Sequence, residues 1–242
     1  MMKEVCIYHI AEQFLFEYYC QPGEYRICEE DHAGELLSKG LSQEKRGGLM
    51  GALQSYEKAL AFNPVSTQIY FRLISVHFRL GQLEELFPRT KEVYPYLSTK
   101  AEMAQYYRWL GYYYLEKYQP ELSAALYRYS TLFSKSAQAE EEIRYLEAAM
   151  DRKLADDSQR ELQEKLQKAG IPVTASNVTL ALLYRAGQEA LQHAKDAAGK
   201  NETATAKHWR QQALDCFSMI YDLTEDAQIK EEMEALSRMD LS

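Results

Sequence analysis

The fold is decided by residues 52–64, which read ALQSYEKALAFNP. Ala52 lies four residues before Tyr56 and Ala59 lies three residues after it, so the three side chains share one face of a helix. Small residues on either side of an aromatic ring let a second helix approach closely. Pro64 follows, and a residue that precedes proline is disfavoured in a helix. The stretch therefore predicts a helix that packs tightly against a neighbour and ends near Pro64.

The chain around this stretch repeats itself. A shift of 34 residues pairs Leu36 with Tyr70 and Gly47 with Gly81, and a further shift of 37 pairs Tyr70 with Tyr107. A period of this length accommodates two helices and two turns. The repeating unit is therefore predicted to be a helix hairpin.

A second pattern identifies the kind of hairpin. Residues 107–114 read YRWLGYYY, and Ser123, Tyr127 and Ser130 follow on the next helix. These patterns resemble the tetratricopeptide repeat, whose first helix carries an aromatic residue, Leu-Gly and an aromatic residue, and whose second helix carries small, aromatic and small residues before a proline. Residues 11–18 and 221–224 also look like parts of uncharacterised bacterial proteins of this family. The resemblance implies an all-α fold, a right-handed superhelix of hairpins with an N-terminal extension and a C-terminal capping helix.

We divide the chain into four segments on this basis. Residues 1–32 form an N-terminal extension, residues 33–135 three hairpins, residues 136–172 connecting helices, and residues 173–242 a fourth hairpin followed by the capping helix. In the extension, apolar residues share a helical face and favour a helix, although a strand hairpin around the turn at residues 21–23 is an alternative. Those residues are Ile7, Ile10, Ala11, Phe14, Leu15 and Tyr18.

Two of the hairpins depart from the repeat. In the middle one, Thr90 and Val93 replace the aromatic and the small residue, and Pro88 and Pro95 predict a short or kinked second helix. The fourth one contains a polar insertion at Lys195–Thr205, which is predicted to be either an exposed, mobile loop or an extension of both helices.

The composition agrees with a helical protein. The chain has 242 residues, 46% of them apolar, and only 11 glycines and 6 prolines to interrupt helices. Its formal net charge is −8 and it has no polybasic run, which argues against nucleic acid as a partner. Its apolar runs are shorter than the about 18 residues that a membrane-spanning helix needs. Glu4 and Glu12 interrupt the N-terminal segment, where a signal peptide would need an unbroken apolar run. We therefore predict a cytoplasmic protein that does not bind membranes.

The sequence contains no pattern of a catalytic, metal or cofactor site. The five histidines occur singly, with no HExxH or GxSxG motif. The run Glu140–Glu142 is predicted to be a solvated helix surface. The cysteines form no CxxC pair and are predicted to be buried or incidental thiols: Cys6, Cys20, Cys28 and Cys216. We therefore predict neither an enzyme nor a metal or cofactor site.

A binding groove is predicted on the inner face of the second and third hairpins, where first helices of stacked hairpins line a concave surface. Aromatic side chains beside arginines on this face have the composition of binding hot spots. Residues 65–135 carry 9 basic and 6 acidic side chains, whereas both flanking parts are net negative. The predicted groove consists of Gln68, Phe71, Ser75, Phe78, Arg79, Gln105, Arg108, Tyr112, Leu115 and Glu116.

We interpret the chain as a scaffold that binds an acidic peptide or a helix of a partner protein in this groove. The Lys and Asn that clamp a terminal carboxylate in co-chaperone members of the family correspond to Leu37 and Leu41, which does not support that role. The alternative is a peptide-sensing regulator that acts through a separate effector, since 32 residues before the first hairpin are too few for a DNA-binding domain. The 19 tyrosines are either core or binding surface.

Overall fold

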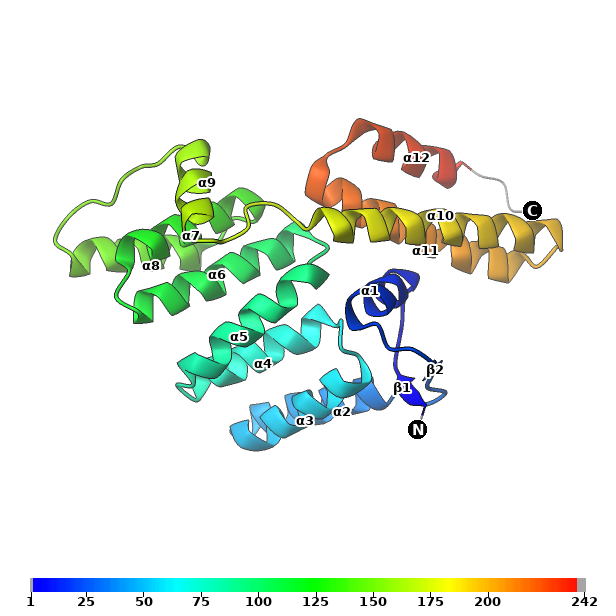
Figure 1. The fold of residues 1–242 in the computed structure, drawn as a ribbon, viewed down its shortest axis with the longest axis horizontal. Helices are drawn as coiled ribbons and strands as arrows, with labels where there is room; N and C mark the ends of the chain where they lie inside the picture. Colours follow the sequence, from blue (N-terminus) through cyan, green and yellow to red (C-terminus); the bar gives the residue numbers. More distant parts are fainter. Residues whose placement is uncertain (1, 239–242) are drawn as a thin grey trace. The chain divides into compact units, whose positions relative to one another are not determined.

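The computed structural model describes residues 2–238. Twelve α-helices, one 3-10 helix and two three-residue strands make up this part of the chain (Figure 1). The predicted all-α fold class is therefore confirmed. The chain divides into two compact units: one contains the residues up to Ile69 together with those from Ser176 onward, and the other runs from Tyr70 to Ala175.

The first hairpin consists of α2 (His32–Lys45) and α3 (Leu49–Phe62), which pack against each other. The turn between them passes through Gly47, which has a φ of 78°. Glycine adopts a positive φ without the steric penalty that other residues have. The ring of Tyr56 is fully buried against Gly40 of α2, where an added Cβ would lie 2.3 Å from the ring. The small and aromatic residues at 52–59 therefore form the close helix contact that their spacing predicts.

A second hairpin of the same unit consists of α10 (Asn177–Gly199) and α11 (Thr203–Thr224), followed by α12 (Ala227–Ser237). Its closest approach is at Gly187, where an added Cβ would lie 2.9 Å from the ring of Phe217. The apolar core around this contact also takes residues from α1 and α12. The pattern of small residues facing an aromatic residue thus recurs in this hairpin.

The polar insertion extends both helices of this hairpin. Helix α10 continues to Gly199 and α11 begins at Thr203, so the turn between them has three residues. Ala197 and Ala206 are buried against each other beneath the extension. The alternative of an exposed loop is therefore wrong. One buried alanine on each helix forms a small apolar contact that stabilises the extension of both helices.

The N-terminal extension contains a helix, α1 (Ile10–Cys20), between strands β1 (Lys3–Val5) and β2 (Tyr25–Ile27). The two strands pair in parallel, and α1 packs on α10. The backbone N–H of Ile10 donates to Oε1 of Gln212 at 2.9 Å, which holds the start of α1 to α11. The antiparallel hairpin around residues 21–23 is not formed, since residues 14–19 belong to α1. Strands of three residues are too short to show an alternating pattern in the sequence.

The other unit contains most of α4 (Thr67–Arg79), followed by α5 (Leu83–Val93), α6 (Lys100–Glu116), α7 (Pro120–Phe133) and two further helices. Helices α6 and α7 pack against each other as a pair. Helix α5 has 11 residues, against 14 in α3 and α7, and Pro88 lies inside it. A 3-10 helix that contains Pro95 follows. Thr99 and Glu102 form a capping box at the start of α6.

Helices α8 (Ala137–Ala149) and α9 (Gln159–Lys168) both pack against α7.

The tyrosines of this unit form much of its core. Tyr107 and Tyr129 are buried, and their hydroxyls donate to the backbone oxygens of Pro172 and Val173 at 2.9 and 2.6 Å. These phenols therefore fasten the segment after α9 to the α6–α7 pair, which is a structural role.

His9 gives the unit with α1 a specific pH dependence. Its Nδ1 accepts from the N–H of Ala11 as the N-cap of α1, and its buried Nε2 lies 3.6 Å from Asp215 of α11. Burial lowers the pKa of His9 below 6.5; Asp215 opposes this shift and His208 adds to it. The unfolded chain thus binds a proton at a higher pH than the folded one. Stability is therefore lost as the pH falls through 6.5.

We expect the His9→Asn protein to lose less stability than wild type between pH 7 and pH 5, because asparagine keeps an N-cap acceptor and does not titrate. Urea unfolding followed by circular dichroism at each pH measures this difference. Equal losses in the two proteins would show that His9 is not the responsible group.

Candidate functional site

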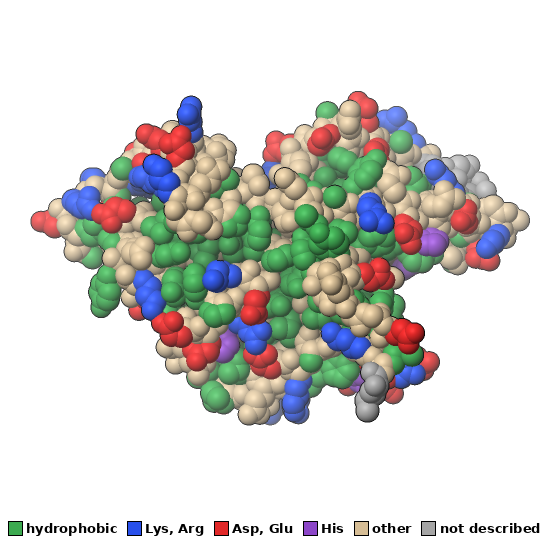
Figure 2. Space-filling view, viewed as in Figure 1, with side chains coloured by type: hydrophobic (Ala, Val, Ile, Leu, Met, Phe, Trp, Pro, Cys, Tyr) green, Lys and Arg blue, Asp and Glu red, His purple; other side chains and the backbone are tan. Residues whose placement is uncertain are grey.

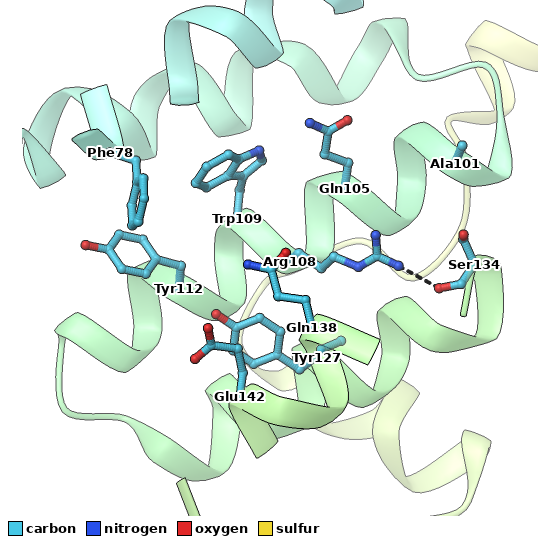
Figure 3. A pocket seen from close by; sticks show the side chains of 11 residues that line it. Phe78, Ala101, Gln105, Arg108, Trp109, Tyr112, Tyr127, Ser134, Gln138 and Glu142 are labelled. Atoms are coloured by element: carbon cyan, nitrogen blue, oxygen red, sulfur yellow. Dashed lines mark hydrogen bonds between the residues drawn. The ribbon is translucent and has the colours of Figure 1, made fainter. Parts of the chain in front are cut away.

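A cavity of about 440 Å³ opens beside α6 in the unit that runs from Tyr70 to Ala175 (Figure 3). The end of α4 forms one wall, α6 forms the floor, and α7 and the start of α8 form the opposite wall. The lining residues are Phe78, Ala101, Gln105, Arg108, Trp109, Tyr112, Tyr127, Ser134, Gln138, Ala139 and Glu142.

One end of the cavity is aromatic. Trp109 and Tyr112 stand one helical turn apart on α6, and Phe78 reaches them from the last turn of α4. The Phe78 ring centroid lies 5.6 Å from that of Trp109 and 4.7 Å from that of Tyr112, in an edge-to-face arrangement with the tyrosine. Phe78 is nevertheless 41% exposed. The three rings, which we call the aromatic wall, thus offer apolar surface to a ligand.

Arg108 provides a cation at the other end (Figure 3). Its Nη2 donates to the backbone oxygen of Ser134 at 2.6 Å, and its Nε donates to Oγ of Ser130 at 3.4 Å. Burial lowers the pKa of Arg108, but an arginine stays charged at neutral pH. No carboxylate among residues 2–238 forms an ion pair with it. The guanidinium therefore keeps donors for a ligand, because only two of its five N–H groups are used.

Glu142 of α8 places a negative charge across from Arg108, next to Tyr127 (Figure 3). Burial, and then Glu142, raise the pKa of Tyr127, so its hydroxyl stays protonated. The Tyr127 ring is held by the close approach of α6, where a Cβ on Gly111 would lie 3.2 Å from it. Oγ of Ser123 reinforces this contact by donating to the backbone oxygen of Gly111 at 2.8 Å. The cavity thus has a rigid wall and charges of both signs.

Four of the ten predicted groove residues line this cavity: Phe78, Gln105, Arg108 and Tyr112. Gln68, Ser75, Arg79 and Glu116 are not among its lining residues, and Leu115 packs against the apolar cluster of α7 and α8. The prediction that Phe71 is exposed is wrong, because only 8% of the residue is accessible. Isoleucine, tyrosine and leucine neighbours make the first turns of α4 apolar on more than one face, so spacing alone does not select the buried one.

Sequence reasoning missed the contribution of α8 and the indole of Trp109. Trp109 lies inside the motif at residues 107–114, directly after Arg108. Its place beside a predicted groove residue is the sequence signal that could have identified it as a lining residue. Gln138 and Glu142 lie on a helix for which the sequence predicts only a connecting role. Ala139 and Leu146 are buried on the same helix. Their spacing predicts that this face of α8 packs against α7, which leaves the neighbouring positions beside the cavity.

The cavity does not have the residues of a metal site. Neither histidine nor cysteine lines it, and no group of three or more potential ligands occurs in the described part of the chain. Its polar groups are a guanidinium, phenols, amides, a serine and one carboxylate. Such groups bind and orient a ligand by hydrogen bonds. Within residues 2–238, moreover, every helix falls short of the combined length and apolarity needed to cross a membrane.

Comparison with known proteins supports no family assignment. No family model matches the chain, and no curated protein matches it. Among solved structures, the chain is similar to a bacterial tetratricopeptide repeat protein. That protein, a TPR repeats protein from Bacteroides fragilis, is 14% identical, with a TM-score of 0.35 over 87% of this chain and 100% of the other. The helix-hairpin description of the fold rests on the packed helix pairs themselves.

Proposed function

We propose that this protein is a non-enzymatic interaction module that binds a peptide segment of a partner protein in the cavity beside α6. The observation that supports the proposal is the combination of a partly buried arginine without an ion-pair partner and a partly exposed aromatic wall. Arginine, tryptophan and tyrosine dominate binding hot spots because they combine large contact area with directed hydrogen bonds.

The chemistry of the ligand follows from the two ends of the cavity. An apolar or aromatic side chain fits against Phe78, Trp109 and Tyr112. A carboxylate fits beside Arg108, since a hydrogen-bonded ion pair with a partly desolvated guanidinium is stronger than one in water. A volume of about 440 Å³ lies within the range of ligand pockets and suits a few side chains rather than a whole domain.

The ligand we propose carries one carboxylate rather than a run of acidic residues. Only one of the two predicted arginines lines the cavity, and Glu142 lines it as well. A long acidic segment would bring like charges against Glu142. The proposed peptide therefore has an acidic residue, an apolar anchor and a polar or basic residue on the side of Glu142.

Charge on the surface agrees with a protein partner. Figure 2 shows basic and acidic side chains intermixed on the viewed face, without the continuous basic patch that a nucleic-acid partner requires. A scaffold and a peptide-sensing regulator would both use the same cavity. Binding is thus the common step, and it can be tested without knowing the partner.

The experiment is a selection of peptides from a random displayed library on the wild-type protein. We expect the selected peptides to share an acidic residue and an apolar anchor. Arg108→Gln should raise their dissociation constants by about 10-fold or more, which is the cost of one charged hydrogen bond. Trp109→Ala should raise them by about 30-fold, the threshold of a hot spot. Isothermal titration calorimetry measures both changes.

Two control variants match these changes on the same unit. Arg144→Gln removes an exposed arginine of α8, and Tyr118→Ala removes a ring that is 93% exposed; neither residue lines the cavity. Both controls should bind like wild type and keep its melting temperature. Arg108→Gln and Trp109→Ala lose contacts within the fold, so they should melt below wild type but still give the circular dichroism spectrum of a folded helical protein at the assay temperature. If the selected peptides bind the Arg108 and Trp109 variants as tightly as wild type, the cavity is not the binding site.

A further inference from the structure

We propose that Cys6 and Cys28 form a reversible disulfide, which makes the N-terminal strands a redox modification site. The two cysteines are far apart in the sequence and belong to no CxxC motif. The structure brings them together because each directly follows the last paired residue of a strand. Val5 of β1 is the register partner of Ile27 of β2.

The backbone geometry suits a disulfide. The N–H of Cys28 donates to the oxygen of Val5 at 2.8 Å, which completes the pairing of Val5 with Ile27, and Cys6 and Cys28 are the next residues in the same register. Neighbouring strands lie about 4.8 Å apart, and disulfides join Cα atoms about 4.4 to 6.8 Å apart. Side chains at registered positions of parallel strands point to the same face. The Cys6 and Cys28 side chains therefore leave the strand pair on the same side.

The surroundings of the two sulfurs differ in a way that suits stepwise oxidation. Cys6 is buried, and its Sγ accepts from the N–H of Ala33 at 3.4 Å in the first turn of the 14-residue helix α2. The same Sγ donates to the backbone oxygen of Glu30 at 3.9 Å. Cys28 is only half-buried. An external oxidant therefore reaches Cys28 first, and Cys6 is placed to attack second.

The reaction needs a two-electron oxidant, for which we name a small-molecule disulfide such as oxidised glutathione. The Cys28 thiolate attacks one sulfur of the oxidant, forming a mixed disulfide and releasing one thiolate. The Cys6 thiolate then attacks the Cys28 sulfur, and the second thiolate leaves. Two protons leave the cysteines and two electrons reduce the oxidant to two thiols. Burial, and then the neighbouring Cys6, raise the pKa of Cys28, so the first step should accelerate as the pH rises above neutrality.

The remaining cysteines are placed differently. Cys216 is fully buried in α11, and burial raises its pKa to about 12. Cys20 ends α1 and is separated from β2 by the turn through Gly23. A bond between Cys6 and Cys28 closes a loop around α1 and ties β1 and β2 beside the start of α2. It therefore constrains the N-terminal segment itself.

The test is oxidation of the folded Cys20→Ser protein with oxidised glutathione, followed by digestion with trypsin under non-reducing conditions. Cleavage after Lys3, Arg26 and Lys39 puts Cys6 and Cys28 in separate peptides, 4–26 and 27–39. We expect a linked pair of these peptides, with two hydrogens lost, that separates on addition of dithiothreitol. The oxidised protein should melt about 5 °C or more above the reduced one, because the bond constrains the unfolded chain.

Two further proteins, the Cys28→Ser variant and wild type, keep the proposal falsifiable. Cys28→Ser changes a half-buried side chain, and its oxidised form should show no linked pair and no rise in melting temperature. Wild type should give the same linked peptides as Cys20→Ser. If glutathione remains attached to Cys28 in the Cys20→Ser protein, or if linkage occurs only when Cys20 is present, Cys6 and Cys28 do not form the proposed bond.

Discussion

The Tyr56→Ala protein is expected to have a free energy of unfolding about 3 to 5 kcal/mol below that of wild type. The ring is fully buried between α2 and α3, and it rests on Gly40, which has no side chain to fill the space that the ring would leave. Its hydroxyl also donates to Oε2 of Glu44 at 2.8 Å. Guanidinium unfolding followed by circular dichroism measures the change.

Tyr118→Ala is the matched control for this prediction, because it removes the same side chain from a position that is 93% exposed. Its stability should lie within about 0.5 kcal/mol of wild type. Tyr56→Phe separates the ring from the hydroxyl and should cost about 1 kcal/mol. An unchanged denaturation midpoint for Tyr56→Ala would contradict the close packing of the first hairpin.

The Phe217→Ala protein is expected to lose a similar amount, about 3 to 5 kcal/mol. Phe217 is fully buried in the core that α1, α10, α11 and α12 share, and Gly187 of α10 packs on its ring. Truncation leaves a cavity that backbone atoms of a neighbouring helix cannot fill. Phe217→Leu keeps much of the volume and should cost less than about 1.5 kcal/mol. Thermal unfolding of both variants gives the comparison, and equal losses would show that volume does not determine the effect.

The helix hairpins could be predicted from the sequence because their information is local. Ala52, Tyr56 and Ala59 define a contact face within two turns of one helix, and Gly187 and Phe217 reproduce it in the last hairpin. Local spacing did not determine which of two aromatic residues is exposed. Phe71 and Phe78 are seven residues apart and share a face of α4, yet only Phe78 is exposed, since burial depends on what packs against each end of the helix.

The candidate site was predicted in part for the same reason. Arg108 and Tyr112 belong to one helix face that the repeat orients. Glu142 and Gln138 come from α8, whose approach to α6 depends on how both helices pack on α7. Cys6 and Cys28 meet through the pairing of two three-residue strands. Such long-range contacts leave no periodic pattern in the sequence.

The most direct test of peptide binding in the cavity uses the fluorescence of Trp109. The chain has two tryptophans, and Trp209 lies in the other unit, packed against the rings of His193 and His208. The Trp209→Phe protein therefore reports on the cavity alone, and the Trp109→Phe protein reports on the remainder. Each is titrated with the tightest selected peptide.

We predict that the peptide shifts the emission of the Trp209→Phe protein to shorter wavelength, because the indole of Trp109 loses contact with water. The shift should saturate with the dissociation constant measured by calorimetry, and the emission of the Trp109→Phe protein should stay unchanged. Binding by calorimetry without a change at Trp109, or with a change at Trp209 instead, would place the binding site outside the cavity and contradict the account.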